Sequence, residues 1–595
     1  MLNDKKPDSK KGIHKMNIKK IPYGDSDYGK IIEQNKLYVD KTRFIHELES
    51  LPDYIFLIRP RRFGKSLWIN LLQYYYDSNR KKQFDTLFKD TYIWQNPTPN
   101  KNKYLTLAFN FAMVDPNYDR VQDAFQRYVN NVIDDFLKRY QQSFDKQILT
   151  EIQSISFIDE KIQKLFLYCA RHQLKVYMFI DEYDNFTNTI LTTSGKVKYL
   201  KLTQGEGAFR YFFNLLKGLT SMPDSGLDKL FITGVSPVTM DDVTSGFNIG
   251  TNVSLNKNIN EFMGFTESET LEILRYYHDA GQLTLDIDFC MDIMKQWYNN
   301  YCFAENAQNL LFNSDMVLYF VHQTMQDSKI PKDLIDQNIR IDYKKLRYLI
   351  TIDKQLNGNF SRLKDIIEKQ EIISGIVKSF PVEEFNEQEN FISLLYYFGL
   401  LTIQGEKRGK YLLKIPNLTI QNLMYGYIRN GFKDVNIFKI DMWKLSDIIT
   451  NMAYDGDWKP FFIYLSEQIE KQTAIRDYLN GEKVVQGFLL AYLNVVDYYI
   501  TQSEAELNKG YSDIYMEPFM SKYPDLEYSY LIELKYIARG EYSEKIQKEK
   551  IQDAQEQLDQ YVKSDGIQKS IASTKLIKII LVYKGWELIY CEEYA

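Results

Sequence analysis

The chain has 595 residues, of which 44% are hydrophobic and 26% are charged, and its formal net charge is −5. This length is sufficient for three to four domains, and the composition is typical of a water-soluble globular protein. No apolar run reaches the roughly 18 residues that a membrane-spanning helix needs, so we expect no membrane partner. Because the net charge is negative, any contact with nucleic acid must come from a local basic patch.

The four cysteines, Cys169, Cys290, Cys302 and Cys591, are scattered without C-x-x-C spacing, and the five histidines are also dispersed. This pattern argues against a structural zinc site and against a disulfide framework. The first residues lack the apolar segment of a signal peptide, so we expect no export and a cytoplasmic location. We predict no histidine or thiol chemistry.

Residues 1–20 are polar and rich in lysine, which predicts a loosely attached arm, with a nucleic-acid-binding arm as the alternative. Between residues 21 and 255, helical patterns separate apolar runs. This alternation predicts an α/β doubly wound domain. The expected strands cover residues 54–58, 104–109, 175–180, 229–235 and 252–255.

The apolar run at 54–58 breaks into a basic loop that contains Gly64, and a helical pattern follows. Strand, loop and helix in this order are typical of a phosphate-binding loop. In such a loop, backbone N–H groups and the helix N-terminus point at phosphate oxygens. Lys65 would then reach the β- and γ-phosphates, and the hydroxyl of Ser66 would be a ligand of Mg²⁺. The sequence therefore predicts an ATP and Mg²⁺ site.

The loop departs from the pattern G-x-x-x-x-G-K-[ST], because its first position is Arg59 instead of glycine. This is acceptable only if the backbone at Arg59 does not need a positive φ. Arg61 and Arg62 add charge that could cradle phosphate or pair with carboxylates. The alternative is a strand followed by a basic helix N-terminus. We predict that the nucleotide contacts come from the whole loop: Arg59, Pro60, Arg61, Arg62, Phe63, Gly64, Lys65 and Ser66.

A second apolar strand, at 175–180, ends in the adjacent carboxylates Asp181 and Glu182. We predict that Asp181 holds Mg²⁺ through water and that Glu182 acts as the general base that polarises the attacking water. The strand at 229–235 carries the hydroxyls of Thr233 and Ser236. Either could sense the γ-phosphate, and the open alternative is a hydroxyl that satisfies its own strand end.

The sequence contains the short motifs Ile21-Pro-Tyr-Gly24, Tyr38-Val-Asp40-Lys41-Thr42, Arg59-Pro-Arg-Arg-Phe-Gly-Lys-Ser66, Ile180-Asp-Glu-Tyr-Asp184 and Gly264-Phe-Thr266. Together they resemble those of a known family, the AAA-ATPase-like proteins that carry a C-terminal PD-(D/E)XK nuclease domain. The resemblance covers most of the chain and implies that the missing first glycine is a family trait. Asp40 and Thr42 belong to one motif, and we expect them to cap a helix over residues 43–48.

The middle of the chain is mostly helical. Residues 256–345 are expected to form a helical lid whose first long helix begins after the N-cap Thr266. Residues 346–480 contain a helix at 391–399 followed by a hairpin, which together predict a winged-helix-like unit. Its basic wing, with Lys407 and Arg408, could read DNA, but we favour a packing role.

From residue 481 the pattern changes to a predicted restriction-endonuclease-like α/β domain that ends at residue 595. Asp513 is expected to begin a strand that pairs with residues 530–536, which would bring its carboxylate near Glu533. Glu533 and Lys535 share one face of their strand because side chains alternate. We predict that Asp513 and Glu533 bind Mg²⁺, or Mn²⁺, with help from the Leu534 carbonyl, and that Lys535 orients the attacking water.

Two further features match the PD-(D/E)XK pattern. Glu506 lies seven residues before Asp513, where the pattern has an upstream acidic residue. Gln557 and Tyr561 resemble the Q-x-x-x-Y motif of RecB-like nucleases and project from one helix face, where they could orient metal ligands or contact DNA. The alternative for Gln557 and Tyr561 is that they belong to the ordinary surface or core of the helix.

The favoured interpretation is an ATP-binding and ATP-hydrolysing protein coupled to Mg²⁺-dependent cleavage of nucleic acid, with DNA preferred to RNA. The main alternative is a nucleotide-controlled switch that acts by binding or assembly, in which the nuclease-like domain holds nucleic acid without cutting it. A third hypothesis, a transcriptional regulator that binds DNA through the winged helix, is supported only by Lys407 and Arg408. Whether the protein is a homo-oligomer is left open.

Overall fold

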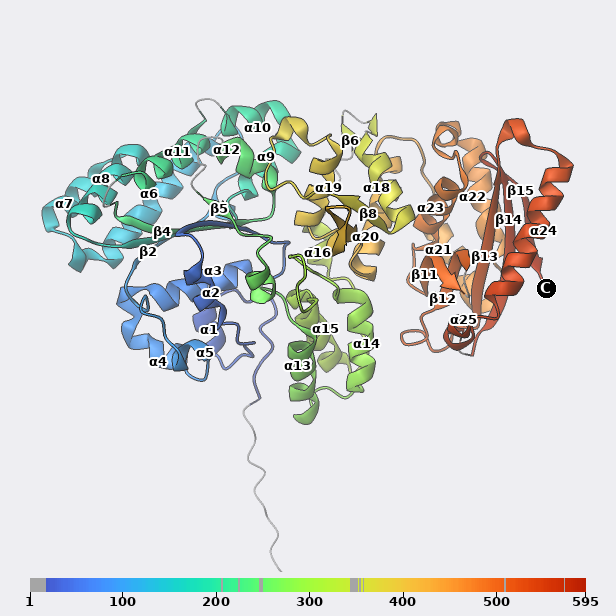
Figure 1. Cartoon of the computed structure of the whole chain (residues 1–595), viewed down its shortest axis with the longest axis horizontal. Helices are drawn as coiled ribbons and strands as arrows, with labels where there is room; N and C mark the ends of the chain where they lie inside the picture. Colours follow the sequence, from blue (N-terminus) through green and yellow to red (C-terminus); the bar gives the residue numbers. More distant parts are fainter. Residues whose placement is uncertain are drawn as a thin grey trace, which may run out of the picture.

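The computed structural model describes residues 18–204, 207–222, 225–244, 250–342, 351–352, 355–356, 358–507, 510–571 and 573–595. The N-terminal and C-terminal regions lie at opposite ends of the long axis (Figure 1). The first 17 residues of the predicted arm lie outside the described residues. Lys20 is already attached, since its backbone N–H donates to the carbonyl of Asn35 at 3.1 Å.

The N-terminal region is built around a five-stranded parallel sheet in the order β2-β3-β4-β1-β5. All six residues of β3 are buried, as expected for a parallel sheet that is covered on both faces. The parallel sheet confirms the predicted α/β fold. Because the strands are parallel, their carboxyl ends meet at one edge of the sheet. The strands are β1 (Tyr54–Ile58), β2 (Leu105–Asn110), β3 (Val176–Asp181), β4 (Leu227–Gly234) and β5 (Thr251–Asn252).

Helices cover both faces of this sheet, with α6, α8 and α11 on one side and α1 to α5 on the other (Figure 1). The bounds are α1 (Tyr28–Glu33), α2 (Phe44–Ser50), α3 (Lys65–Tyr76), α4 (Phe84–Leu87), α5 (Tyr92–Gln95), α6 (Val121–Arg139), α7 (Lys146–Ser154), α8 (Ile158–Arg171), α9 (Asn185–Ser194), α10 (Lys196–Thr203), α11 (Ala208–Thr220) and α12 (Pro237–Thr244).

Asp40 and Thr42 do not cap α2, which has no side-chain cap. The Asp40 carboxylate accepts a hydrogen bond from the N–H of Tyr92 at 2.7 Å, and the Thr42 hydroxyl accepts one from the N–H of Ile93 at 3.0 Å. They therefore satisfy the first two N–H groups of α5, a helix about 50 residues further along the chain. The prediction of a local cap was wrong because the two side chains face a distant helix.

The lid region is a helical bundle with its own apolar core, which includes Leu274, Cys290 and Phe320. As predicted, Thr266 caps the first long helix, in a capping box with Glu269. The helices are α13 (Glu267–Asp279), α14 (Ile287–Tyr298), α15 (Ser314–Asp327) and α16 (Gln337–Asp342).

The middle region contains the predicted winged-helix-like unit, with an antiparallel sheet in the order β8-β10-β9. Helix α19, in the place of a recognition helix, is buried at every position from Asn390 to Tyr397. A helix must be exposed to enter a DNA groove, so α19 packs and cannot read DNA. The elements are α18 (Gly358–Lys369), β8 (Glu371–Ser374), α19 (Gln388–Tyr397), β9 (Thr402–Lys407) and β10 (Lys410–Lys414), next to a short pair, β6 (Thr351–Ile352) and β7 (Gln355–Leu356).

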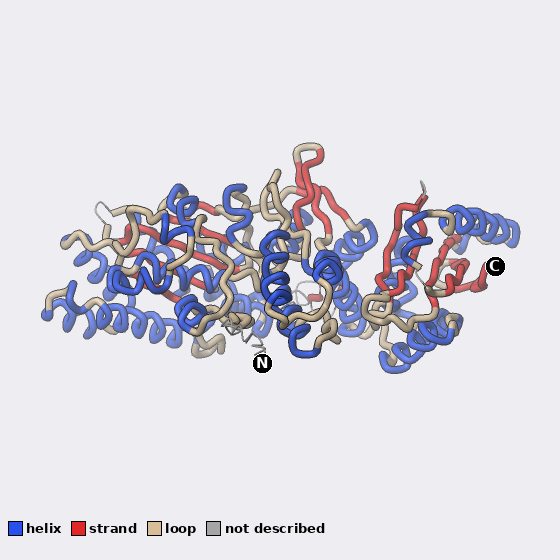
Figure 2. The backbone as a smooth tube through the Cα atoms, turned by 90° about the horizontal axis from the view of Figure 1, so that it is seen from below, coloured by secondary structure: helices blue, strands red, loops and turns tan. Residues whose placement is uncertain are grey.

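The C-terminal region is a second five-stranded sheet, in the order β11-β12-β13-β14-β15, in which only β13 and β14 run parallel. In Figure 2 its strands lie at the opposite end of the molecule from the N-terminal sheet. Among the described residues, no helix is both long and apolar enough to cross a membrane. The strands are β11 (Tyr499–Leu507), β12 (Gly510–Pro518), β13 (Tyr528–Ile537), β14 (Lys575–Lys584) and β15 (Glu587–Tyr594).

Helices precede this sheet and cover it. Helix α24 packs Ala554 and Leu558 against one face of the sheet. The strand that carries Asp513 begins at Gly510, three residues earlier than predicted. The helices are α20 (Leu418–Asp434), α21 (Met442–Asp455), α22 (Lys459–Lys471), α23 (Glu482–Leu493), α24 (Glu544–Tyr561) and α25 (Asp565–Ser570).

Candidate nucleotide and metal sites

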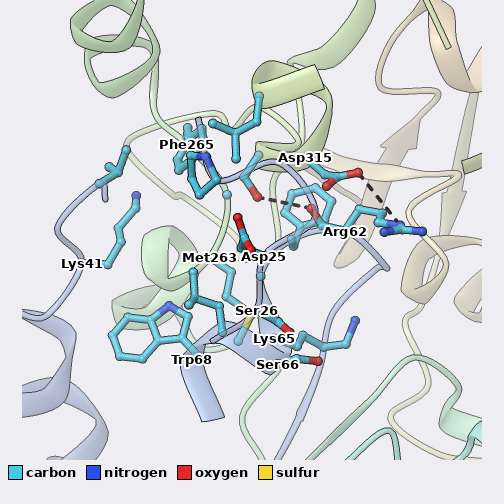
Figure 3. A pocket seen from close by; sticks show the side chains of 18 of the residues that line it. Asp25, Ser26, Lys41, Arg62, Lys65, Ser66, Trp68, Met263, Phe265 and Asp315 are labelled. Carbon is cyan, nitrogen blue, oxygen red and sulfur yellow. Dashed lines mark hydrogen bonds and ion pairs between the residues drawn. The ribbon is translucent and has the colours of Figure 1, made fainter. Parts of the chain in front are cut away.

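The predicted phosphate-binding loop opens onto a cavity of about 340 Å³. β1 ends at Ile58, and Gly64, at φ 93°, precedes the first residue of α3. The cavity is large enough for a small ligand or cofactor. Its walls come from segments that are far apart in sequence (Figure 3): N-terminal residues between 22 and 41, the loop and start of α3 at 61–71, Glu182 after β3, and the lid residues 262–265 with 314–318.

Lys65 is the first residue of α3, and its side chain is buried. Its Nζ donates hydrogen bonds to the backbone carbonyls of Arg59 at 3.1 Å and Pro60 at 2.9 Å. Burial lowers the pKa of Lys65, although the nearby charges of Glu182 and Asp181 oppose this shift. The ammonium is therefore held by neutral carbonyls that an anionic phosphate could replace.

The Ser66 hydroxyl, at the start of α3, lies close enough to the Asp181 carboxylate, at the end of β3, to affect its pKa. Asp181 is buried, and burial raises its pKa to about 6, whereas the Ser66 hydroxyl acts to lower it. A hydroxyl and a carboxylate are the hard oxygen donors that Mg²⁺ prefers. These residues, which lie more than 100 positions apart in sequence, therefore fit the ion that the loop implies.

Glu182 lines the same cavity and has a backbone φ of 48°. Positive φ is uncommon for a residue other than glycine, and such conformations cluster at functional sites. The Glu182 carboxylate accepts a hydrogen bond from the side-chain amide of Asn185, in the first turn of α9. Asn185 was not predicted, although its position three residues after Glu182 could have indicated it.

Arg59 and Pro60 do not face the cavity. The positive φ angles in the loop belong to Arg62 and Gly64, so arginine can occupy the first position without strain. The Arg59 side chain is only 1% exposed and donates to the carbonyl of Ser254 at 2.6 Å. The prediction that Arg59 and Pro60 contact nucleotide was therefore wrong for their side chains, because both point into the protein.

The remaining loop residues connect the loop to the lid. Arg61 and Arg62 line the cavity, and Arg62 and Asp315 point toward one another in Figure 3, with Nε 4.0 Å from the carboxylate. The Arg62 carbonyl accepts a hydrogen bond from the Ser314 hydroxyl at 3.2 Å. Phe63 borders the cavity, but its ring is buried edge-on against Phe303.

Thr233 is not placed as a phosphate sensor. It is fully buried on β4, and its hydroxyl donates to the Leu57 carbonyl of the adjacent β1 at 2.8 Å. Ser236 is also buried, and its N–H donates to the Asp184 carboxylate at 2.7 Å. Neither residue lines the cavity. The Thr233 hydroxyl bonds the neighbouring strand β1, so the structure shows neither the predicted cofactor contact nor the alternative of a hydroxyl that satisfies its own strand end.

The second candidate site lies where β12 and β13 pair. Their antiparallel register, with Ile514 opposite Ile532, brings Asp513 next to Glu533. The Asp513 carboxylate accepts a hydrogen bond from the Leu534 N–H at 2.8 Å. Burial raises the pKa of both carboxyls, and the proximity of Asp513 adds to the rise at Glu533. A buried carboxylate beside a partly buried one is costly without a cation.

Lys535 provides part of that positive charge. Its Nζ donates to Oε1 of Glu533 at 2.7 Å and also to the side-chain carbonyl of Gln557 on α24. Burial lowers the pKa of Lys535, but the charge and hydrogen bond of Glu533, together with the charges of Asp513 and Glu482, outweigh burial, so the pKa is raised. The other oxygen of Glu533, Oε2, is buried and has no hydrogen-bond partner among the described residues. This orphaned oxygen fits a divalent cation.

The other predicted residues of this site differ in their placement. Gln557 contacts Lys535 directly, whereas the ring of Tyr561 is 3% exposed in the apolar core under α24. Glu506 lies on β11 opposite Tyr511, but its side chain lies outside the described residues, so its role remains a prediction. Among the residues that the structure describes, no three His, Cys, Asp or Glu side chains are arranged around a metal position.

Helix α23 contributes two residues that the sequence analysis missed. The Glu482 carboxylate accepts a hydrogen bond from the Tyr536 N–H at 3.1 Å, and Gln486 donates to the carbonyl of Asp513. Burial is the largest cause of the raised pKa of Asp513, and the negative charge of Glu482 adds to this rise. The spacing of four on one helix face was a signal, but only the fold brings that face to β12 and β13.

Comparisons with known proteins match the two regions of the chain that contain these candidate sites. Residues 22–244 match the family model described as predicted AAA-ATPase, and residues 480–593 match that of the PD-(D/E)XK nuclease superfamily. A curated relative, "Uncharacterized protein in vnfD 5'region" of Azotobacter chroococcum mcd 1, is 23% identical over 68% of this chain and 69% of its own. A solved structure of the ORC2 protein of Aeropyrum pernix (ADPNP-ADP complexes) aligns with 11% identity and a TM-score of 0.26 over 65% of this chain and 92% of that chain.

Proposed function

Because the chain joins a predicted AAA-ATPase domain to a domain of the PD-(D/E)XK nuclease superfamily, we propose that ATP binding and hydrolysis control Mg²⁺-dependent cleavage of nucleic acid, with DNA as the preferred substrate. One observation supports this most strongly: in each of the two regions, the fold brings a buried lysine close to two acidic residues, which are the residue types that the two reactions need.

At the nucleotide site, Lys65 would turn from the loop carbonyls to the phosphates, and Ser66 with Asp181 would hold the metal. The bound Mg²⁺ supplies neutralisation of the phosphate charge. Glu182, held by Asn185, would accept the proton of the attacking water. Burial of these groups strengthens their electrostatic effect on the reacting phosphate.

At the nuclease site, Asp513 and Glu533 would hold the metal, with Mn²⁺ as an alternative to Mg²⁺. The bound metal supplies polarisation of the phosphodiester and of a water molecule. Lys535 would orient that water and stabilise the charge that develops in the transition state. Gln557 accepts a hydrogen bond from the Lys535 ammonium from the side of α24, and this contact helps to hold the ammonium next to Glu533.

Contacts of the lid support control of one site by the other. Ser314 and Asp315, in the first turn of α15, touch the phosphate-binding loop at Arg62. The core of the same bundle includes Phe519, which follows the last residue of β12 and stacks on Trp297 with ring centroids 5.9 Å apart. A shift of the lid on nucleotide binding would therefore act on the strand that carries Asp513.

The test is cleavage of a panel of single-stranded and double-stranded DNA and RNA, with Mg²⁺ or Mn²⁺, in the presence and absence of ATP. We expect the wild type to cut DNA and the Glu533→Gln variant, which keeps the shape but lacks the charge, to cut nothing. Failure of the wild type to cut any substrate, or equal cutting by the variant, would favour the alternative of a switch that binds nucleic acid without cutting it.

A further inference from the structure

The residue at the first position of the phosphate-binding loop, Arg59, is fully buried and takes part in none of the steps above. Its guanidinium donates to the carbonyls of Ile58 at 3.1 Å, Ser254 at 2.6 Å and Ile259 at 3.4 Å. It also lies over the ring of Phe303 at 4.5 Å. A buried charge with this many contacts is costly to place and holds its neighbours in one arrangement.

The partners of Arg59 belong to separate parts of the chain. Ile58 ends β1, Ser254 and Ile259 follow β5, and Phe303 lies between the lid helices α14 and α15. Phe303 in turn accepts, through its carbonyl, a hydrogen bond from the Tyr396 hydroxyl of α19 at 3.0 Å. Arg59 therefore connects the end of β1 to the winged-helix-like unit through one intervening residue.

The next loop residue touches the same unit directly. Gly399, at φ 76°, forms the turn after α19, and a Cβ added to it would lie 2.8 Å from the ring of Pro60. Beside this contact, the Cys302 N–H donates to the Thr402 hydroxyl of β9 at 2.7 Å. Pro60 is thus packed against the segment that joins α19 to β9, while Arg59 is linked to α19 through Phe303.

Lys65 depends on the same two loop residues, since its ammonium is bonded to the carbonyls of Arg59 and Pro60. When a phosphate takes the ammonium, these two carbonyls lose their donor. This loss of hydrogen bonds therefore occurs at the two residues that are linked to the winged-helix-like unit. Ligand binding can alter a distant element only if some interaction differs between the bound and the free state, and these hydrogen bonds are such an interaction.

We propose that Arg59 is a positioning residue: its buried side chain holds the first two loop residues in place for Lys65 and links nucleotide binding to α19 and β9. This inference depends on the proposed ATP binding. It makes an unusual prediction about the loop motif. Arg59→Gly restores the pattern G-x-x-x-x-G-K-[ST], yet it should weaken ATP binding by about tenfold, because three carbonyls lose their donor and the loop gains freedom.

Two measurements test the proposal. The first is the affinity for a non-hydrolysable ATP analogue. The second is hydrogen–deuterium exchange in residues 388–407 with and without that analogue. The variants are Arg59→Gly, Arg59→Lys and, from the other side of the link, Phe303→Leu. The matched control is Arg139→Lys, because Arg139 also donates to a strand carbonyl, Thr106 at 2.6 Å, and lies over an aromatic ring.

In the wild type and the control, the analogue should change exchange over 388–407. In Arg59→Lys and Phe303→Leu that change should fall to less than about half, while the unliganded proteins keep the wild-type exchange pattern elsewhere. If Arg59→Gly does not fold, Phe303→Leu decides the outcome. Unchanged responses in the folded variants, or tighter binding by Arg59→Gly, would overturn the inference alone. A wild type that does not bind the analogue would overturn the proposed function as well.

Discussion

The two candidate sites both contain a buried lysine next to two acidic residues, but the lysines have different partners. Lys65 donates only to the neutral carbonyls of Arg59 and Pro60 in the hydrogen bonds described above. Lys535 donates to the carboxylate of Glu533. The first lysine is therefore positioned to exchange its partners for an incoming anion, whereas the second balances charge that belongs to the site itself.

This difference means that removal of each lysine should affect ligand binding in a different way. Without Lys65, the nucleotide site loses a partner for its ligand. Without Lys535, the nuclease site loses a cation that competes with its ligand for Glu533.

Glu182→Gln should reduce ATP turnover by about 10²- to 10⁴-fold, since a general base is lost, while ATP affinity stays the same. Turnover and binding would be measured separately on the purified protein. Glu160→Gln, an exposed position on α8, is the matched control and should behave as wild type. Wild-type turnover in Glu182→Gln would remove Glu182 from the mechanism.

Lys535→Met should reduce the rate of cleavage by about 100-fold, because stabilisation of the transition-state charge is lost. Affinity for Mn²⁺ should be kept or increased, since no ammonium competes for Glu533. Calorimetric titration with Mn²⁺ and single-turnover cleavage check the two parts, with the exposed Lys545→Met as control. Weaker metal binding in Lys535→Met would contradict the contrast between the two lysines.

Lys65→Ala should weaken ATP binding by at least about tenfold, or ~1.4 kcal/mol, because a buried charge-assisted contact with phosphate is removed. Equilibrium binding of a fluorescent ATP analogue gives the value. Lys175→Ala, at an exposed position in the same domain, should not change it. Equal affinities of Lys65→Ala and wild type would exclude this loop as the nucleotide site.

Thr233→Val should change ATP affinity and turnover by less than about threefold. The lost hydrogen bond to the Leu57 carbonyl should lower the free energy of unfolding by about 1 kcal/mol. Thermal unfolding with and without ATP separates the two effects. A large fall in turnover at unchanged affinity would instead restore Thr233 as a phosphate sensor.

Features that follow from local patterns could be predicted from the sequence. The strand, loop and helix around Gly64 and the position of Asp181 at a strand end follow from hydrophobic periodicity and from adjacent residue types. The pairing of Asp513 with Glu533 also followed, because alternation along two short strands leaves few registers.

Features that depend on tertiary contacts could not be predicted. The direction of the Arg59 side chain is set by carbonyls about 200 residues away, and no local pattern indicates it. The hydroxyl of Thr233 faces β1 because of the strand order, which the sequence does not state. Glu482 joins the nuclease site through the packing of α23, about 50 residues before Tyr536.

The most direct test of the central claim, that the nucleotide site controls the nuclease site, is the single-turnover rate of DNA cleavage with saturating ATP divided by the rate without nucleotide. We predict that this ratio differs from one in the wild type and returns to one in Lys65→Ala, whose ATP-independent rate stays at the wild-type value. A ratio of one in a wild type that binds ATP and cuts DNA would contradict control. The same ratio in Lys65→Ala and wild type would contradict control through this loop.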